Sequence, residues 1–518
     1  MQKNKILFHG RHLLHTTFQE QALGRLAQRL KAESGEVEVV FAVTSANHAN
    51  SRFNPVPFHY RSIGIDLFAR TVLEPIDVTW HIIPIPHMTP TERFAERIIS
   101  HAKAASEGAL GISPDNTIAF CSTAPLIEQF RKLGFEVDAA EYDVRTKQNI
   151  ARVPQDILKE FAPRMKSWAT LPLDDELSGA TKKLWRTYPE IAAEIERLWN
   201  EQLLTEHGDL TETRDYGTYS FSMSKHEVID HKYQVIKSGI VPGVIVDEGC
   251  ADGALLVRIA RDYPDSDLIG IEITREFLAE ARERVRRGEF GNSFVFLYQR
   301  NLARKIFDDA SVDTTICNST THEIWSYGSG DATLKAYLKH KFAQLRPGGA
   351  LVIRDVVGPE AGEGEIYAWF NDTDGVTPPP DDVKQYPVKE LSTKGRFYRF
   401  AKEFFNGRGV AYAEQIRDGE SLIRARRKDI ADFLSKKSYV DNWDSELHES
   451  FTHWPYSRWK AELEAVGFAV DEGISKAYVN EWIVEKYIKG TTRLYAEENG
   501  ALVDEPFPPT NIILVARK

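Results

Sequence analysis

A short apolar run that leads directly into a glycine-rich bend, VIVDEGCADGALL at residues 244–256, is the feature that most constrains the fold of this chain. The apolar run predicts a buried strand, and the segment ALLVRIARDY after the bend predicts a helix. Gly249 and Gly253 allow a sharp turn and a close approach of the backbone to a ligand, which a Cβ atom would obstruct. In an open parallel sheet, ligands bind beyond the carboxyl ends of the strands. The segment therefore predicts an α/β domain with a ligand site, and places Asp247 and Glu248 at its edge.

Strands alternate with helices along much of the 518-residue chain. In residues 1–150 this alternation predicts parallel βαβ units, with strands expected at 5–10, 36–44, 78–85 and 116–121. Charged helical patterns predict a helical connector at 151–214. Residues 215–518 are predicted to form a second α/β domain, interrupted by an insertion at about 358–456. The predicted fold class is thus α/β, with two Rossmann-like parallel-sheet domains, the second of which carries a large insertion.

Composition argues against several classes of protein. The formal net charge of −11 gives no general attraction to nucleic acid, and the densest basic run, RARRK at 424–428, fits a solvated helix face. No apolar run is long enough to span a membrane. The cysteines, Cys121, Cys250 and Cys317, fit a reducing cytoplasm better than a disulfide framework or a zinc site. We therefore expect a cytoplasmic protein without a metal site, a nucleic-acid partner or a membrane anchor.

The strand that follows the bend narrows the choice of ligand. DLIGIEIT ends in Glu272, at the place where a carboxylate can accept hydrogen bonds from both hydroxyls of a ribose. A nicotinamide dinucleotide and a nucleoside that carries a sulfonium group both fit this pattern, because a glycine-rich loop after a strand also serves dinucleotides. The bend and this strand leave the two ligands open.

Three further features distinguish these ligands. The glycine-rich loop lies in the middle of the chain and lacks the full Gly-x-Gly-x-x-Gly spacing, LRPGGALVIRDV at 345–356 places a Pro-Gly-Gly turn before a strand, and GFAVDEG at 467–473 is followed by a last apolar strand at 511–518. Together these segments resemble the class I S-adenosylmethionine-dependent methyltransferases, over about 215–518 apart from the insertion. The first motif of that family is acid-x-Gly-x-Gly-x-Gly, and here Ala251 stands at the middle glycine.

The resemblance implies S-adenosylmethionine (SAM) as the cofactor. In that family the bend after the first strand holds the methionine part, the acid after the second strand holds the ribose, residues after the third strand meet the adenine, and the end of the fourth strand lies under the sulfonium. Carried over to this sequence, the implied cofactor-binding residues are Asp247, Gly249, Ala251, Asp252, Gly253, Glu272, Ile273, Asn301, Leu302 and Asn318.

The segment after the fourth strand of this domain, NSTTHEIWSYG at 318–328, is expected to face the methyl acceptor. His322, Glu323 and Tyr327 are its candidate catalytic residues. The ordinary pKa of histidine suits a base near neutral pH, and Glu323 could orient the ring or pair with a cationic substrate. Equally, Glu323 could cap the neighbouring helix while His322 only packs. Tyr219 and His226 could form a lid or belong to the core.

Aromatic and basic residues are interleaved in the predicted insertion, at 395–428. Such a segment suits a lid that stacks on a planar or anionic substrate. It suits a helical packing layer equally well, and the sequence does not decide between the two.

The first domain begins with KILFHGRHLLHTTFQEQAL, in which Gly10 and Arg11 follow a strand. Residues 3–145 resemble the archaeal-type nicotinamide-mononucleotide adenylyltransferases. Of that family's phosphate-binding motif, Gly10 and Arg11 remain, His15 matches one histidine, and Thr17 and Phe18 stand where a Gly-His pair would fall. The implied nucleotide-binding residues are Gly10, Arg11, His15, Ser45, Asn47, Asn54, Arg61 and Ser122. The altered motif favours a nucleotide-binding or a structural domain over an active transferase.

These observations predict a SAM-dependent methyltransferase that acts on a small molecule, nucleotide-like or from a specialised metabolic pathway. The first domain would bind a nucleotide or serve the structure. The alternatives are a bifunctional nucleotidyltransferase and methyltransferase, or a non-catalytic scaffold that senses nucleotides. The sequence leaves a homo-oligomer open.

Overall fold

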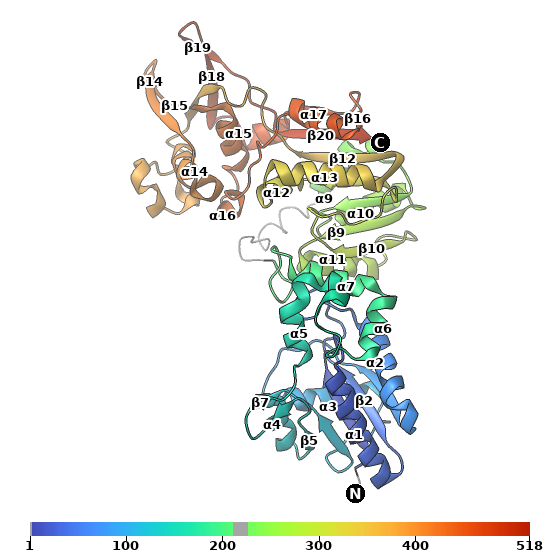
Figure 1. Ribbon diagram of the computed structural model, residues 1–518. Coiled ribbons are helices and arrows are strands. Elements are labelled where there is room, and N and C mark those ends of the chain that lie inside the picture. Colours follow the sequence, from blue (N-terminus) through green and yellow to red (C-terminus); the bar gives the residue numbers. More distant parts are fainter. Residues whose placement is uncertain (1–2, 211–225) are drawn as a thin grey trace. The chain divides into compact units, whose positions relative to one another are not determined.

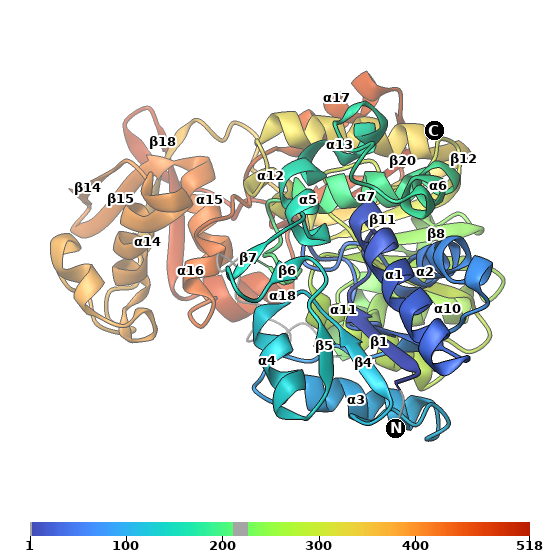
Figure 2. The ribbon, with the colours of Figure 1, turned by 60° about the horizontal axis from the view of Figure 1, so that its bottom comes forward.

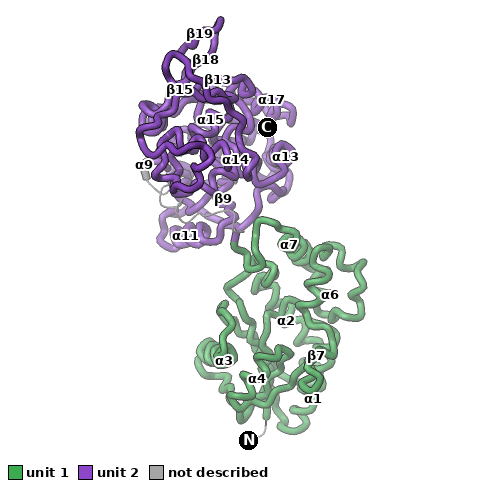
Figure 3. The backbone as a smooth tube through the Cα atoms, turned by 90° about the vertical axis from the view of Figure 1, so that its left-hand side faces the viewer, with its two compact units in different colours: residues 1–209 green, residues 210–518 purple. Residues whose placement is uncertain are grey.

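The computed structural model describes residues 3–210 and 226–518 (Figure 1). The chain divides into two compact units, Met1–Asp209 and Leu210–Lys518, called unit 1 and unit 2 below (Figure 3). No helix in the described ranges is long and apolar enough to cross a membrane.

Unit 1 contains a five-stranded parallel sheet of order β3-β2-β1-β4-β5. Side chains of β1 alternate between two layers: Ile6 and Phe8 pack against one pair of helices and Leu7 against the other pair. Figure 2 labels these helices as α1 to α4 around β1 and β4. The strands are β1 (Lys5–Gly10), β2 (Glu38–Val43), β3 (Thr79–Pro84), β4 (Thr117–Phe120) and β5 (Glu136–Asp138). The helices of the two layers are α1 (Thr17–Ser34) with α2 (Phe58–Val72), and α3 (Phe94–Ala105) with α4 (Ala124–Lys132). The predicted parallel α/β class is confirmed for this unit.

The helices predicted as a connector pack within unit 1. They are α5 (Pro154–Phe161), the 3₁₀ segment Ala162–Thr170, α6 (Gly179–Thr187) and α7 (Pro189–Trp199). Their apolar faces enclose Leu13, Leu14 and Val56, which belong to the first part of the chain, together with Trp185 of α6. A two-stranded hairpin, β6 (Tyr142–Asp143) and β7 (Gln148–Asn149), precedes them and was not predicted.

Unit 2 is built on a larger sheet of order β10-β9-β8-β11-β12-β20-β16, in which β20 is antiparallel to its neighbours. The strands are β8 (Val244–Glu248), β9 (Asp267–Glu272), β10 (Val295–Gln299), β11 (Val312–Asn318), β12 (Leu345–Val356), β16 (Ala469–Val470), β17 (Lys476–Tyr478) and β20 (Asn511–Arg517). One face is covered by α9 (His226–Ile236), α10 (Ala254–Asp262) and α11 (Arg275–Arg286), and the other by α13 (Asp331–Gln344) and α17 (Tyr456–Val466). The strand order reverses between β8 and β11, which is where ligands bind in open α/β sheets.

A second, antiparallel sheet of order β14-β15-β13-β18-β19 forms a lobe of unit 2. Its strands are β13 (Glu365–Phe370), β14 (Tyr412–Arg417), β15 (Glu420–Arg426), β18 (Thr492–Glu498) and β19 (Ala501–Asp504), and its main helices are α14 (Thr393–Gly407), α15 (Arg427–Lys436) and α16 (Trp443–Glu446). The lobe thus extends beyond the predicted insertion. The aromatic residues of α14 and α15, including Phe397, Phe400 and Phe433, are buried in its core. They form the packing layer rather than a substrate lid.

Candidate functional site

The two acids at the end of β8 point in opposite directions, because successive side chains of a strand alternate. Glu248 is fully buried toward α13, where it accepts a hydrogen bond from the Tyr337 hydroxyl at 2.7 Å and pairs with Lys341. Asp247 lies on the other face of the sheet, near the carboxyl end of β8, where the strand order reverses; this end of β8 and β11 is called the crevice below, by analogy with the ligand sites of open α/β sheets. Only one of the two acids is therefore available to a ligand.

Asp247 is a buried carboxylate with an uncommitted oxygen. Its side chain is 1% exposed, and its Oδ2 atom has no hydrogen-bond partner among the described residues. Burial, with the nearby carboxylates of Glu272 and Glu248, raises the pKa of Asp247 to about 7. A buried polar atom without a partner is costly, so this oxygen is suited to a hydrogen-bond donor or cation supplied by a ligand.

The bend after β8 has the backbone conformation that the sequence predicts. Gly249 and Gly253 have φ of 75° and 78°, and Ala251, in place of a glycine, has φ of 45°. A Cβ atom at Gly249 would overlap the side-chain hydroxyl of Thr320. Asp252 is engaged in the structure itself, because its Oδ1 accepts from the backbone N–H of Ala254 at 3.1 Å at the start of α10 and its carboxylate pairs with Arg284.

Glu272, at the end of β9, faces the bend. Its Oε2 accepts from the N–H of Ala251 at 3.0 Å, and its Oε1 accepts from the N–H groups of Ile273 at 2.7 Å and Thr274 at 2.9 Å. Burial raises the pKa of Glu272, and these amides oppose the rise. A carboxylate offers roughly four acceptor positions, so binding both hydroxyls of a ribose would displace at least one of these amides.

The predicted cofactor-binding residues that follow β10 and end β11 contact their neighbours in the chain or the core of the unit. The Asn301 Oδ1 atom accepts from the N–H of Ala303 at 2.9 Å, and Leu302 packs against the core on the α13 side. Asn318 ends β11, and its Oδ1 accepts from the Ser319 hydroxyl at 3.3 Å.

Asp355, near the end of β12, organises the loop that follows β11. Its Oδ2 accepts from the N–H groups of Thr320 at 3.1 Å and Thr321 at 2.6 Å, and from the Thr321 hydroxyl at 2.5 Å. Its Oδ1 lies 2.7 Å from His322 Nδ1. Burial alone would raise the pKa of Asp355, but His322 and the hydrogen bonds hold it below its ordinary value. The sequence analysis missed this residue, because only the β11–β12 register brings it to the loop.

His322, a residue of α12 (Thr321–Ser326), lies between the carboxylates of Asp355 and Glu449. Its Nε2 atom lies 3.3 Å from Glu449 Oε2, in addition to the contact with Asp355. Burial acts to lower the pKa of His322, but the two carboxylates raise it well above its ordinary value. The ring is therefore a cation near neutral pH, with no lone pair free to accept a proton. This geometry favours a fixed cation over the general base expected from the sequence.

The other two candidate catalytic residues also lie on or next to α12. Glu323 is in its first turn, and Tyr327 follows its last residue, with the Tyr327 N–H donating to the Glu323 carbonyl at 2.9 Å. Tyr219 and His226 are predicted to form a lid or to belong to the core. Tyr219 and the side chain of His226 lie outside the described part of the chain.

Two buried cations lie near the same strand ends. Burial, together with the Arg354 guanidinium, lowers the pKa of Lys232 of α9 to about 7, and the Asp355 and Asp247 carboxylates act in the opposite direction. Arg354 of β12 is 6% exposed and donates to the Ser319 hydroxyl at 3.1 Å, while its Nε has no partner among the described residues. An anionic group could therefore be held here.

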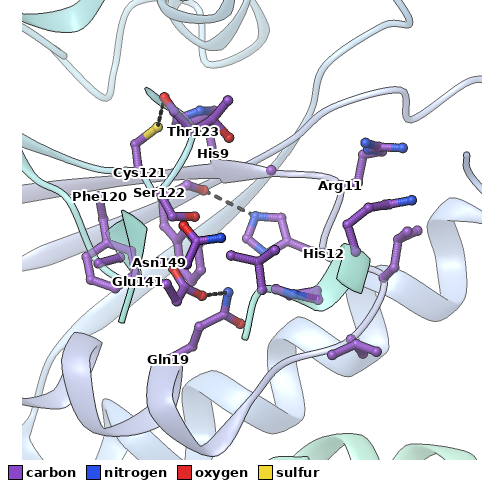
Figure 4. Close-up of a pocket in the computed structure, with 18 residues that line it drawn as sticks. His9, Arg11, His12, Gln19, Phe120, Cys121, Ser122, Thr123, Glu141 and Asn149 are labelled. Atoms are coloured by element: carbon purple, nitrogen blue, oxygen red, sulfur yellow. Dashed lines mark hydrogen bonds between the residues drawn. The ribbon is translucent and has the colours of Figure 1, made fainter. Parts of the chain in front are cut away.

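Unit 1 has its own cavity at the carboxyl ends of β1 and β4, again at the reversal of the strand order (Figure 4). The cavity has a volume of about 240 Å³. Figure 4 shows the side chains of Ser122, Glu141 and Asn149 lying toward one another, with Arg11 away from them. Gln19 donates to Glu141 Oε1 at 2.7 Å, and burial raises the pKa of Glu141.

His9 and His12, which line the cavity, and His15, whose Nε2 lies 3.2 Å from His12 Nδ1, carry no charge near neutral pH. Burial lowers the pKa of His9 to about 4 and that of His15 to about 3, and it also lowers the pKa of His12 well below its ordinary value. His15 stacks on Phe68, with 4.3 Å between ring centres. The histidines therefore supply no positive charge for phosphate groups, and Arg11 is the one lysine or arginine among the described residues that line the cavity.

Of the predicted nucleotide-binding residues, only Gly10, Arg11 and Ser122 line the cavity. Arg61 instead donates to three backbone carbonyls, those of Arg11, Thr44 and Ser45, at 2.8 to 2.9 Å. Of the other four, His15 stacks on Phe68 and does not line the cavity. Ser45, Asn47 and Asn54 hold the loop after β2: Asn54 donates to the Ser45 carbonyl at 3.1 Å, Asn47 accepts from the His87 N–H at 2.6 Å, and the Ser45 hydroxyl lies 3.0 Å from His87 Nδ1. Three of the predicted residues thus line the cavity, and hydrogen bonds join Arg61 to Arg11 and Ser45, and Asn54 to Ser45.

The basic run at 424–428 is neutralised within the lobe. Each of its four cations pairs with a carboxylate: Arg424 with Glu365, Arg426 with Asp429, Arg427 with Glu505, and Lys428 with Glu363. Such a surface offers little free positive charge to a nucleic acid.

A family model described as a methyltransferase domain matches residues 242–403, which include the glycine-rich bend and Asp355. No curated protein matches the sequence. Among solved structures, a SAM-dependent methyltransferase from Mesorhizobium loti is 14% identical, with a TM-score of 0.32, 56% of this chain and 100% of that chain covered. One from Methanosarcina mazei is 14% identical, with a TM-score of 0.29 and 55% and 96% covered.

Proposed function

We propose that unit 2 is a SAM-dependent methyltransferase that acts on a small molecule. The observation that carries the proposal is the buried Oδ2 of Asp247, which has no hydrogen-bond partner among the described residues and directly precedes the glycine-rich bend. SAM fits these residues, because its ammonium group can donate to Asp247 while its ribose reaches Glu272. The family match to residues 242–403 supports the same assignment.

The residues of the crevice would bind and align rather than react. SAM would supply a methyl group bonded to a positively charged sulfur, and the sulfur would leave as a lone pair of the acceptor attacks the methyl carbon in line. Asp247 and the bend hold the methionine end, Glu272 and Ile273 hold the nucleoside, and Asn318 lies at the end of β11 next to the loop that Asp355 fixes. Alignment of this kind contributes a large part of the rate in such displacements.

A nucleotide-like acceptor suits the cationic side of the crevice. Arg354 is buried and its Nε has no partner among the described residues. A methyl acceptor that carries a phosphate or carboxylate group would provide a hydrogen-bond partner for this Nε–H group.

Calorimetric titration tests the proposal. SAM and S-adenosylhomocysteine are expected to saturate one site, and NAD is expected not to. Glu272→Ala should weaken both adenosyl ligands, whereas Glu276→Ala, on the exposed side of α11, should not. Saturation by NAD alone would contradict the proposal.

For unit 1 we propose a binding domain rather than an adenylyltransferase. Its cavity lies at the position where α/β sheets bind ligands, but neutral histidines and the Glu141 carboxyl line it. This lining favours an uncharged part of a ligand, such as a nucleoside, over a triphosphate. Titration with adenosine and with tripolyphosphate would test this: only adenosine is expected to bind.

A further inference from the structure

Two glutamates of the lobe face the loop that carries His322. Glu446 is the last residue of α16, and Glu449 follows it in the next turn, with its N–H donating to the Glu446 carbonyl at 3.2 Å. Both side chains are buried, at 6% and 7% exposed. The N–H of Ser450 donates to the Ser326 hydroxyl at 2.9 Å, which fixes this segment against α12.

The Glu446 carboxyl has an oxygen that the described residues leave unsatisfied. Its Oε2 is buried and has no hydrogen-bond partner among them. Burial, followed by the neighbouring Glu449 carboxylate, raises the pKa of Glu446 to about 8. A buried carboxyl beside another carboxylate keeps its proton to a higher pH than an exposed glutamate does, so Glu446 is the proton-holding member of the pair.

The charged groups around this pair do not remove the proton. Lys436 is already paired with Asp432 and lies 3.5 Å from the centre of the Phe451 ring, and His322 shares its charge between Glu449 and Asp355. The titratable and charged groups that act on the pair from the surrounding elements are Glu323 and His322 of α12, Lys436 of α15 and Tyr439.

A continuous chain of contacts joins the pair to the cofactor crevice. The Thr320 side chain lies against Gly249 of the bend, and the Thr320 N–H donates to Asp355. Asp355 contacts His322, whose other ring nitrogen contacts Glu449. These contacts link Glu449, and with it the segment that carries Glu446, to the loop after β11, which is expected to meet the acceptor.

We infer that the Glu446–Glu449 pair takes up the proton that the acceptor loses on methylation, and that His322 positions this pair as a fixed cation. The inference rests on the proposed function of unit 2. The acceptor lone pair forms a bond to the methyl carbon, and the carbon–sulfur bond breaks with its electrons passing to sulfur. The acceptor proton moves to the carboxylate pair and later to solvent. The acceptor class is thus one that carries a proton, such as an amine, phenol or thiol, rather than a carboxylate.

The first experiment detects the proton without any turnover. Infrared difference spectra of the full chain with bound S-adenosylhomocysteine, recorded between pH 6 and 10, should show a protonated carboxyl group that titrates near pH 8. Glu446→Gln should remove this band, because the amide is neutral and similar in shape. Glu464→Gln, an exposed glutamate of α17, is the matched control and should leave the band unchanged.

The second experiment measures transfer from SAM to a panel of small amines, phenols and thiols by formation of S-adenosylhomocysteine. The wild-type rate should rise about tenfold per pH unit and level off above about pH 8, since the base acts when deprotonated. Glu446→Gln should lower kcat by about 100-fold or more and abolish this rise, with the KM for SAM unchanged. His322→Gln should shift the pH midpoint, which a purely structural role would not do.

The outcomes separate the two proposals. No carboxyl titration between pH 6 and 10, or a Glu446→Gln enzyme with the wild-type pH profile, would overturn the inference while leaving SAM binding intact. Failure of SAM and S-adenosylhomocysteine to bind would instead remove the proposed function. Loss of both the infrared band and the pH dependence in Glu446→Gln, but not in Glu464→Gln, supports the inference.

Discussion

Replacing Asp247 by asparagine should stabilise unit 2 at alkaline pH while weakening SAM binding. The pKa of this carboxyl is raised from 3.8 to about 7, a shift of about 3 units that corresponds to about 4 kcal/mol. The folded protein therefore holds the Asp247 proton more tightly than the unfolded chain does between about pH 4 and 7, and the free energy of unfolding falls as pH rises through this window. Asparagine is neutral throughout and does not suffer this loss.

The magnitude is reduced by Lys232, whose charge partly offsets the ionised carboxylate. We expect Asp247→Asn to exceed the wild type by about 2–4 kcal/mol in local unfolding free energy at pH 8, and by little at pH 4.5. Hydrogen exchange of the β8 and β11 amides in the ligand-free protein measures this within unit 2. Asp267→Asn, at the exposed start of β9, is the control. A gain that is absent at pH 8, or equal at both pH values, would refute the reasoning.

Three further predictions follow from the geometry. Gly249→Ala should abolish SAM binding measured by calorimetry, because the new Cβ would overlap Thr320 and because Gly249 has a φ of 75°. A wild-type affinity would contradict the role of this bend in binding. Lys341→Met should lower the urea-measured free energy of unfolding by about 3–5 kcal/mol, since it leaves Glu248 buried and unpaired, whereas Lys341→Met with Glu248→Leu should recover most of the loss. Incubation with ATP and nicotinamide mononucleotide should release no pyrophosphate, because His9 and His12 beside Arg11 are neutral. Release of pyrophosphate would instead support an adenylyltransferase activity of unit 1.

The sequence predicts the sheets well, because strand periodicity and glycine bends are local signals. The buried strands of the parallel sheet of unit 1 and of the main sheet of unit 2, and the bend at Gly249, are where the sequence places them, whereas the antiparallel sheet of the lobe was not predicted. The predicted connector and insertion depart from the structure, since packing between distant segments decides which helices and strands belong together. The alternation of side chains along β8 could have separated Asp247 from Glu248.

The acceptor side of the site was less predictable, because its chemistry depends on long-range neighbours. His322 has a suitable ordinary pKa for a base, and only the contacts with Asp355 and Glu449, 33 and 127 residues away in the numbering, show that it is a cation. In unit 1, the position of Gly10 and Arg11 at the end of the first strand indicates where the cavity lies. The polar side chains that line it, such as Glu141, come from segments without a motif.

The interleaved path of the chain through unit 2 limits how the lobe can move. The backbone leaves the main sheet after β12, returns for α17, β16 and β17, leaves again for β18 and β19, and returns for β20. Four tethers, rather than one hinge, therefore join the lobe to the sheet, and two of them continue directly into the neighbouring strands β12 and β20. A displacement of the lobe would therefore act on β12, the strand that carries Asp355, and through Asp355 on the loop that follows β11.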